Sequence, residues 1–256
     1  MYYNREEYSI YYKKYGNKEK TILILPGWGD TRETFYNIIN YLQEDYTIYI
    51  IDYPGFGKSV FPNKDLTIYD YTNIIRSFMT DFDIINPIII AHSFGGRIAT
   101  LLAGYYKEKI DKLIMIDTAG IKHKKGILKW LKEKTYKLLK LIKYILPKKK
   151  RQKYIEKLLN LFGSTDYKNL NNCMRKTFQN IIGEDLKYYL KEINTETLLI
   201  WGKLDESTPL KDGKIMNKLI KDSALIIFPK GNHFTYLQYP ILITNIIKEF
   251  IKETNT

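Results

Sequence analysis

Residues 91–96 read Ala91-His92-Ser93-Phe94-Gly95-Gly96, and they stand between an apolar run and a segment with helical spacing. The apolar run Pro87–Ala91 is typical of a strand buried on both faces, and Gly96–Tyr106 is typical of a helix. A sharp strand-to-helix turn exposes the hydroxyl of its serine, and small flanking residues let the backbone fold back tightly. The start of the helix also favours negative charge that develops nearby. We therefore predict Ser93 as a nucleophile, with a helix cap as the alternative role.

Strand-like and helix-like segments alternate on both sides of this turn. Further strands are predicted within Tyr2–Tyr15 and at Thr21–Leu25, Tyr46–Ile51, Lys112–Ile116, Thr197–Trp201 and Ala224–Phe228. Further helices are predicted at Glu33–Leu42, Ile68–Phe82, Lys211–Ile220 and Pro240–Ile251. Short buried strands that alternate with helices predict an α/β fold with a mostly parallel, doubly wound sheet.

Residues 120–193 interrupt this alternation, since they contain no strand-like run. Their apolar residues recur at helical spacing in three amphipathic stretches, with lysines on the opposite helix faces. We therefore predict two parts. Residues 1–119 and 194–256 form an α/β core, and residues 120–193 form a helical lid.

The net charge of the 256-residue chain is +13. Residues 122–191 hold 20 Lys and Arg against five acids, a net of +15, which leaves −2 for the rest of the chain. The basic insert could attract an anionic substrate or a membrane surface, or its lysines could only keep an apolar lid in solution. No nucleic-acid-binding module is recognisable, so we expect no nucleic-acid partner.

The single cysteine, Cys173, excludes an internal disulfide, as is typical of proteins in a reducing compartment. The N-terminal residues lack the apolar core of a signal peptide. No apolar run approaches the ~18 residues that a membrane span needs. We expect a soluble, cytoplasmic protein.

A serine hydroxyl is a weak nucleophile and needs a base within hydrogen-bond reach, for which the chain offers three histidines. His92 adjoins the serine on the turn, so we expect it to point away from the pocket and to serve in packing. His123 opens the basic insert, where a solvated position is expected. His233 follows the last apolar strand in the turn 231–234 (GNHF), and active sites gather in such loops at the carboxyl edge of a parallel sheet. We predict His233 as the base.

A third residue must orient the histidine and stabilise its cationic form. Asp205 lies in residues 201–209 (WGKLDESTP), just past a predicted strand. The order serine, aspartate, histidine along the chain is the order expected of this arrangement. We predict Asp205 as the acid, and two rivals stay open. These are the adjacent Glu206 and Asp117, which ends another predicted strand.

Acyl transfer also needs two hydrogen-bond donors aimed at the oxyanion. The residue after the nucleophile supplies one of them, the Phe94 N–H. The second is expected from the loop Pro26–Asp30 (PGWGD), where glycines let the backbone approach a substrate closely. We predict the Trp28 N–H, with an ordinary glycine turn and a packing role for Trp28 as the alternative.

Five motifs together resemble the α/β-hydrolase superfamily: LPGWGD (25–30), DYPGFGKS (52–59), AHSFGGR (91–97), WGKLDESTP (201–209) and GNHFTYLQYP (231–240). Within it, the chain resembles lidded serine hydrolases such as carboxylesterases and meta-cleavage-product hydrolases. Their nucleophile pattern is G-x-S-x-G, where this chain has Ala91 in the first place, and relatives often carry His-Gly in place of Pro26-Gly27. Epoxide hydrolases and haloalkane dehalogenases resemble residues 52–59 but use an aspartate nucleophile, so Ser93 argues against their chemistry.

The resemblance implies a serine hydrolase that cleaves a carboxylic ester or thioester of a small to medium acyl substrate through an acyl-enzyme. It implies neither a metal nor an organic cofactor. The same triad serves C–C bond hydrolases and amidases, and a hydrolase-fold protein can also bind a ligand with little turnover, so these alternatives stay open. A lid would cover the pocket, and we predict that its apolar stripe lines an acyl-binding space through Leu131, Leu138, Ile142 and Ile145.

Overall fold

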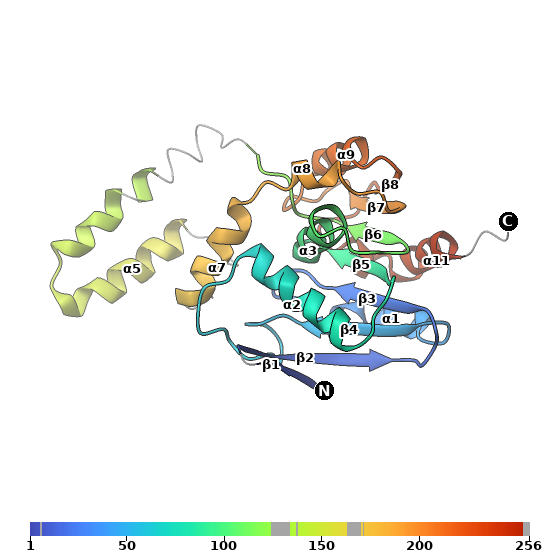
Figure 1. Ribbon diagram of the computed structural model, residues 1–256. Coiled ribbons are helices and arrows are strands. Elements are labelled where there is room, and N and C mark those ends of the chain that lie inside the picture. Colours follow the sequence, from blue (N-terminus) through green and yellow to red (C-terminus); the bar gives the residue numbers. More distant parts are fainter. Residues whose placement is uncertain (6, 124–133, 137, 163–169, 171, 253–256) are drawn as a thin grey trace.

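The computed structural model describes residues 1–5, 7–123, 134–136, 138–162, 170 and 172–252. One eight-stranded sheet has the order β1-β2-β4-β3-β5-β6-β7-β8 (Figure 1). Its strands are β1 (Tyr2–Arg5), β2 (Tyr8–Tyr15), β3 (Thr21–Leu25), β4 (Thr47–Asp52), β5 (Ile88–His92), β6 (Leu113–Ile116), β7 (Thr197–Gly202) and β8 (Ser223–Phe228). β2 pairs antiparallel with β1 and β4, and the other neighbours pair in parallel. The predicted α/β fold with a mostly parallel sheet is confirmed.

Helices cover both faces of the sheet. One face carries α1 (Tyr36–Leu42), after the 3-10 turn η1 (Arg32–Phe35), and α11 (Pro240–Ile251); the other carries α2 (Ile68–Asp81), α3 (Phe94–Thr100), α8 (Lys187–Leu190) and α9 (Leu210–Leu219). Successive side chains of a strand point to opposite faces, so each central strand supplies two cores. In β3, Leu23 and Leu25 join the core beneath α2 and α3, whereas Ile22 and Ile24 join the core beneath α1 and α11. This two-sided burial explains why the strands read as unbroken apolar runs.

Helix α2 begins at a sequence that caps it. The Asp70 N–H donates to Thr67 Oγ1 at 3.2 Å, and the Thr67 N–H donates to Asp70 Oδ2 at 2.7 Å. The first N–H groups of a helix have no acceptor within it, and this capping box supplies one.

Helix α3 begins two residues before the predicted start. It begins at Phe94, directly after the serine, and it continues into the π-helical turn η2 (Leu101–Tyr105). Gly104 in that turn lies against α8, where a Cβ would collide with the carbonyl oxygen of Tyr189. The glycine therefore permits close packing of these two elements.

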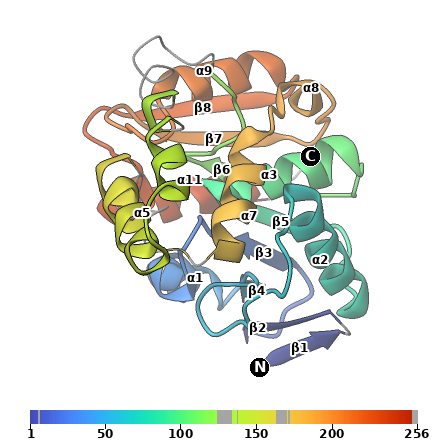
Figure 2. The same ribbon diagram turned by 90° about the vertical axis from the view of Figure 1, so that its left-hand side faces the viewer.

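The described part of the insert between β6 and β7 is mostly helical. Residues 134–136 and 138–141 are helical, and they are followed by η3 (Ile142–Tyr144), α5 (Lys148–Phe162) and α7 (Asn172–Gly183). We call residues 134–136 and 138–162 the basic hairpin. It projects away from the sheet, with α7 between it and the body of the protein (Figures 1 and 2). No helix in the described ranges is long and apolar enough to span a bilayer.

Candidate active site

Ser93 occupies the turn between β5 and α3 with a backbone φ of 47° and ψ of −109°. A positive φ is unfavourable for a residue with a Cβ and persists only where the surroundings hold it. Here the Ser93 N–H donates to the carbonyl of Ile116 at 3.1 Å, and the Ser93 carbonyl accepts from the N–H groups of Gly96 and Ala119 at 3.1 and 3.0 Å. Hydrogen bonds from both sides thus fix a strained turn.

The neighbours of Ser93 are small because other backbone segments lie against them. A Cβ on Gly95 would collide with the carbonyl oxygen of Leu25, and one on Gly96 would collide with Thr118. Ala91 lies fully buried in β5, in register with Leu25 of β3 and Met115 of β6. The buried sheet position accepts a methyl group, which explains alanine in the first place of the motif.

His233 lies between the serine and an aspartate. Its Nε2 is 3.0 Å from Ser93 Oγ, and its Nδ1 is 2.9 Å from Asp205 Oδ2. Asp205 is buried and also accepts the N–H groups of Ser207 and Thr208, at 2.8 and 2.9 Å, and the Thr208 hydroxyl at 2.6 Å. The structure therefore brings together the three residues that the sequence predicted as nucleophile, base and acid.

The contact between Asp205 and His233 shifts the pKa values of the two residues in opposite directions. Burial acts to raise the pKa of Asp205, but hydrogen bonds from His233 and Thr208 outweigh it and hold this pKa below its usual value. Burial acts to lower the pKa of His233, but the hydrogen bond and charge of Asp205 outweigh it and raise this pKa above 6.5. The carboxylate thus stabilises the cationic form of the imidazole.

Asp117, the rival acid, has other partners. Its Oδ1 accepts the Gly202 N–H at 2.8 Å, and its Oδ2 accepts the Thr235 N–H at 3.2 Å. It is fully buried, and burial raises its pKa although these bonds oppose the shift. Asp117 therefore joins the end of β7 to the start of α10 (Thr235–Gln238). Glu206, the other rival, is exposed.

His92 has more than the packing role that was predicted for it. Its Nε2 donates to the carbonyl of His233 at 2.8 Å, and its Nδ1 is 3.0 Å from Asp30 Oδ2. Asp30 belongs to the loop that carries Trp28, so one imidazole joins the serine turn to two other loops of the site. His92 also borders the cavity at Ser93, whereas we expected it to point away.

Trp28 packs against Phe94, the residue that follows Ser93 in the turn. Its ring makes edge contacts with Phe56, Phe94 and Phe178, at centroid distances of 4.7, 5.4 and 5.2 Å. Neither the Trp28 N–H nor the Phe94 N–H has an acceptor among the residues that the structure describes. This leaves both groups available for an oxyanion, and their role stays a prediction.

A cavity of about 320 Å³ opens at Ser93 and His233. The insert and its flanks contribute apolar wall residues to it, namely Ile121, Phe178, Ile181 and Ile182. Arg97 and His123 also line it. Arg97 was not singled out in the sequence, and His123 was expected only at a solvated position, because nothing in the local pattern relates residue 97 or 123 to the pocket. Among the described residues, no group of His, Cys, Asp and Glu is arranged to hold a metal ion.

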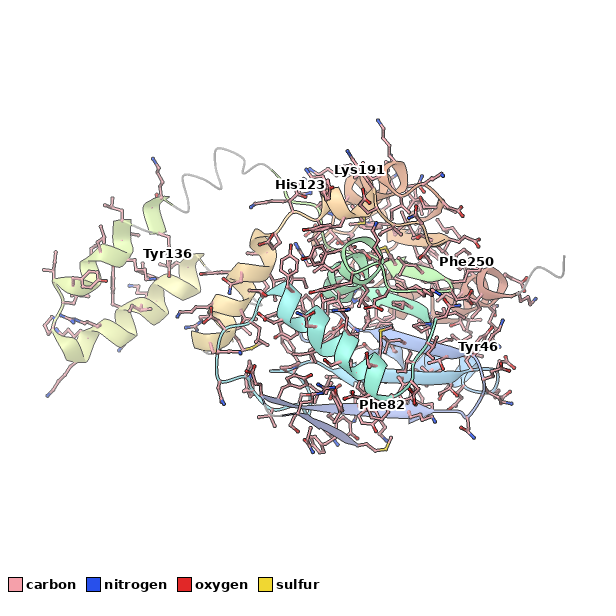
Figure 3. All side chains as sticks on the ribbon, viewed as in Figure 1. Tyr46, Phe82, His123, Tyr136, Lys191 and Phe250 are labelled. Carbon is pink, nitrogen blue, oxygen red and sulfur yellow. The ribbon has the colours of Figure 1, made fainter. Side chains whose placement is uncertain are left out.

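The predicted acyl-binding residues of the lid need correction. Leu138, Ile142 and Ile145 lie on the basic hairpin with exposed fractions of 68%, 39% and 86%, and none of them lines the cavity. Leu131 lies outside the described residues. Figure 3 shows the separation, since His123 lies beside the body of the protein and Tyr136 lies out on the hairpin. The third amphipathic stretch of the insert, α7, supplies Phe178, Ile181 and Ile182 to the cavity in their place.

Comparisons with known proteins identify the family of this chain. A family model described as "alpha/beta hydrolase fold" matches residues 20–140. A pimeloyl-[acyl-carrier protein] methyl ester esterase of Wigglesworthia glossinidia brevipalpis is 32% identical over 267 residues, covering 96% of this chain and 99% of that protein. A monoacylglycerol lipase of Mus musculus is 23% identical, covering 98% of this chain and 81% of the lipase.

Solved structures show the same fold. An esterase from Exiguobacterium antarcticum matches with a TM-score of 0.74 at 22% identity, covering 96% of each chain. A hydrolase from Pseudomonas aeruginosa matches with a TM-score of 0.76 at 16% identity, covering 99% of this chain and 98% of the other. From the fold and the near full-length similarity to the Wigglesworthia esterase, the chain belongs to the α/β-hydrolase family and is an enzyme of that class.

Proposed function

We propose that this enzyme hydrolyses a carboxylic ester or thioester by a two-step acyl-enzyme mechanism, with Ser93, His233 and Asp205 as the triad. The observation that carries the proposal is the position of His233, 3.0 Å from the Ser93 hydroxyl and 2.9 Å from Asp205. A nucleophile, a base and a residue that orients the base form the minimal set for acyl transfer.

In the first step, Ser93 Oγ attacks the substrate carbonyl while His233 Nε2 takes the hydroxyl proton. Asp205 accepts the Nδ1–H of His233, so the lone pair of the neutral imidazole is on Nε2, where the base is needed. The imidazolium that forms is stabilised by the buried carboxylate. The N–H groups of Phe94 and Trp28 would hold the oxyanion.

In the second step, the imidazolium gives its proton to the leaving oxygen or sulfur, and the acyl group stays on Ser93. Water then attacks the acyl-enzyme with His233 again as base, and the serine is released with the free acid. The strained backbone of Ser93 keeps its oxygen at the cavity in both steps.

The substrate we favour is an ester of a medium acyl chain. The apolar wall formed by Ile121, Phe178, Ile181 and Ile182 suits methylene groups. The names of two relatives, a methyl ester esterase for a carrier-bound pimeloyl group and a monoacylglycerol lipase, support esters of acyl chains. We propose that residues 120–193 act as the lid, with residues 120–123 and α7 as the described parts that border the cavity.

The positive charge of the basic hairpin favours an anionic substrate or an anionic carrier. Exposed lysines such as Lys149 and Lys150 stand at the start of α5, and residues 122–191 carry a net charge of +15. A negatively charged acyl carrier would be attracted by it, an effect that salt screens within about 8–10 Å. A lipid surface is the other anionic partner, and binding to anionic but not to neutral vesicles would select it.

Two measurements test the proposed reaction. Labelling by a fluorophosphonate, together with turnover of p-nitrophenyl esters, should occur in the wild type and be absent in Ser93→Ala. Matched ester, thioester, amide and C–C substrates then distinguish the bond type. A protein that binds ligands without labelling and without turnover of any of them would be a binding protein, and the proposal would fail.

A further inference from the structure

Arg97 shares the cavity of the reactive serine. It lies on α3 four residues after Ser93, and residues at this spacing lie on the same face of a helix. The residue lines the cavity together with Ser93 and His233, yet it is only 6% exposed. Four residues of α-helix span about 6 Å, and long side chains lean toward the N-terminal end of a helix. The guanidinium is therefore close to the reacting centre.

This buried cation has few partners. Its Nη1 donates to the carbonyl of Glu184 at 3.1 Å, and within the described ranges no carboxylate lies within ion-pair distance of it. The acid that follows, Asp185, pairs with Lys187 Nζ at 3.0 Å and accepts the Lys122 N–H at 3.3 Å. A guanidinium carries five N–H donors, so most of those of Arg97 are not used by the described residues.

The two carboxylates on the cavity wall are held by other groups. Asp30 lies 3.0 Å from His92 Nδ1, and Asp212 lies 2.8 Å from His123 Nε2. Burial lowers the pKa of Arg97 to about 10, while the charges of Asp185 and Glu184 oppose the shift. Arg97 is therefore still a cation at neutral pH. A buried charge without a counter-ion is costly, and a ligand carboxylate would compensate that cost through paired, charge-assisted bonds.

We propose that Arg97 binds a carboxylate of the substrate, so that the preferred substrate is a small ester with a carboxylate a few carbons from the scissile carbonyl. A half-ester of a dicarboxylic acid has this form. Its methylene groups would lie against the apolar wall, and its carboxylate would accept from the guanidinium. This inference rests on the proposed ester hydrolysis at Ser93 and adds a specificity residue to it.

The test compares monomethyl adipate with the methyl ester of adipic acid monoamide, a neutral molecule of the same shape. The wild type should prefer the carboxylate by kcat/KM. Arg97→Met should reduce this preference ratio about 10- to 100-fold, the range for loss of a charged hydrogen bond. Arg97→Lys should retain part of the ratio, since it keeps the charge but not the planar fork. Lys218→Met, which removes an exposed charge on α9, should leave the ratio within about twofold.

The outcomes separate this inference from the proposed function. If the wild type hydrolyses both esters without preference, or if Arg97→Met lowers both rates equally, Arg97 only joins α3 to Glu184 and the inference is overturned. If the wild type hydrolyses neither ester and is not labelled by a fluorophosphonate, the proposed function fails. Calorimetric binding of monomethyl adipate to Ser93→Ala, with and without Arg97→Met, then tests the carboxylate site directly; equal affinities would also overturn it.

Discussion

The loops at the carboxyl edge of the sheet differ from the basic hairpin in the hydrogen bonds and the burial of their side chains. Asp205 is buried and accepts hydrogen bonds from two N–H groups, a hydroxyl and His233. In the hairpin, the Tyr154 hydroxyl donates to Leu139 and Arg151 donates to Leu146, both within the hairpin, and many of its apolar side chains face water.

We expect this difference to separate two functions within one chain. Hydrogen bonds in a buried site are strong and hold the reacting groups in place before the substrate arrives, so the core loops are suited to chemistry. Exposed cations act at longer range but are screened by salt, so the hairpin is suited to selecting what approaches. Changes in the loops should therefore affect kcat strongly, and changes in the hairpin should affect KM weakly.

The largest effect is expected at the nucleophile. Ser93→Ala removes the proposed nucleophile, so kcat for an activated ester should fall by about 10⁵-fold or more. Stopped assays with p-nitrophenyl butyrate measure this loss, with circular dichroism as a check on the fold. Turnover near the wild-type rate would end the triad assignment.

A smaller but severe effect is expected at the acid. Asp205→Asn favours the wrong tautomer of His233, and kcat should fall by about 10³- to 10⁴-fold. Asp117→Asn is the matched control, since Asp117 bonds to backbone N–H groups of Gly202 and Thr235. It should lower stability more than it lowers kcat. If Asp117→Asn lost most of its kcat while Asp205→Asn kept nearly the wild-type kcat, the acid role would be assigned to Asp117 instead.

The pH profile should show the raised pKa of His233. The base must be neutral, so kcat/KM should rise about tenfold per pH unit below this pKa and level off above it. Asp205 outweighs the opposing effect of burial, so the midpoint should lie above 6.5. A midpoint at or below 6.5 would contradict the stabilisation of the imidazolium by Asp205.

A moderate effect is expected at His92, which positions the loop of His233. His92→Phe keeps a ring but loses the bonds to the His233 carbonyl and to Asp30, so kcat should fall about 10- to 100-fold with little change in KM. His92→Gln, which can still donate one of these bonds, should recover part of the rate. Loss of thermal stability with an unchanged kcat would assign His92 to packing alone.

The smallest effect is expected in the hairpin. Lys149→Gln with Lys150→Gln should lower kcat/KM for an anionic substrate about two- to fivefold at low salt and leave a neutral ester unaffected. The difference should vanish at high salt, because exposed charges are screened. Lys214→Gln with Lys218→Gln on α9 is the control. Flat and parallel salt curves for both substrates would leave the lysines with a role in solubility only.

The hydrophobic pattern of the sequence was enough to predict most of the strands that form the core. Unbroken apolar runs such as Thr21–Leu25 predicted strands that the structure buries on both faces. The serine turn could be located because its small neighbours are a local requirement, and Gly95 indeed lies against the carbonyl of Leu25. The contacts of the hairpin were harder to predict. Helical spacing shows that one face of a helix is apolar, but it does not show which surface that face packs against. The stripe of Leu138 and Ile145 therefore suggested a cavity wall that α7 provides instead.

By itself, then, the sequence determined the α/β sheet, the position of Ser93 and a short choice of partners for it. These follow from interactions between residues close in the chain, namely strand and helix periodicity and the sterics of one turn. Only the tertiary structure showed that Asp205 is the carboxylate in contact with His233, that His92 contacts the His233 loop, and that Arg97 and α7 border the cavity. Each of these depends on groups far apart in sequence, whose distances are decided only when the sheet and its helices pack together.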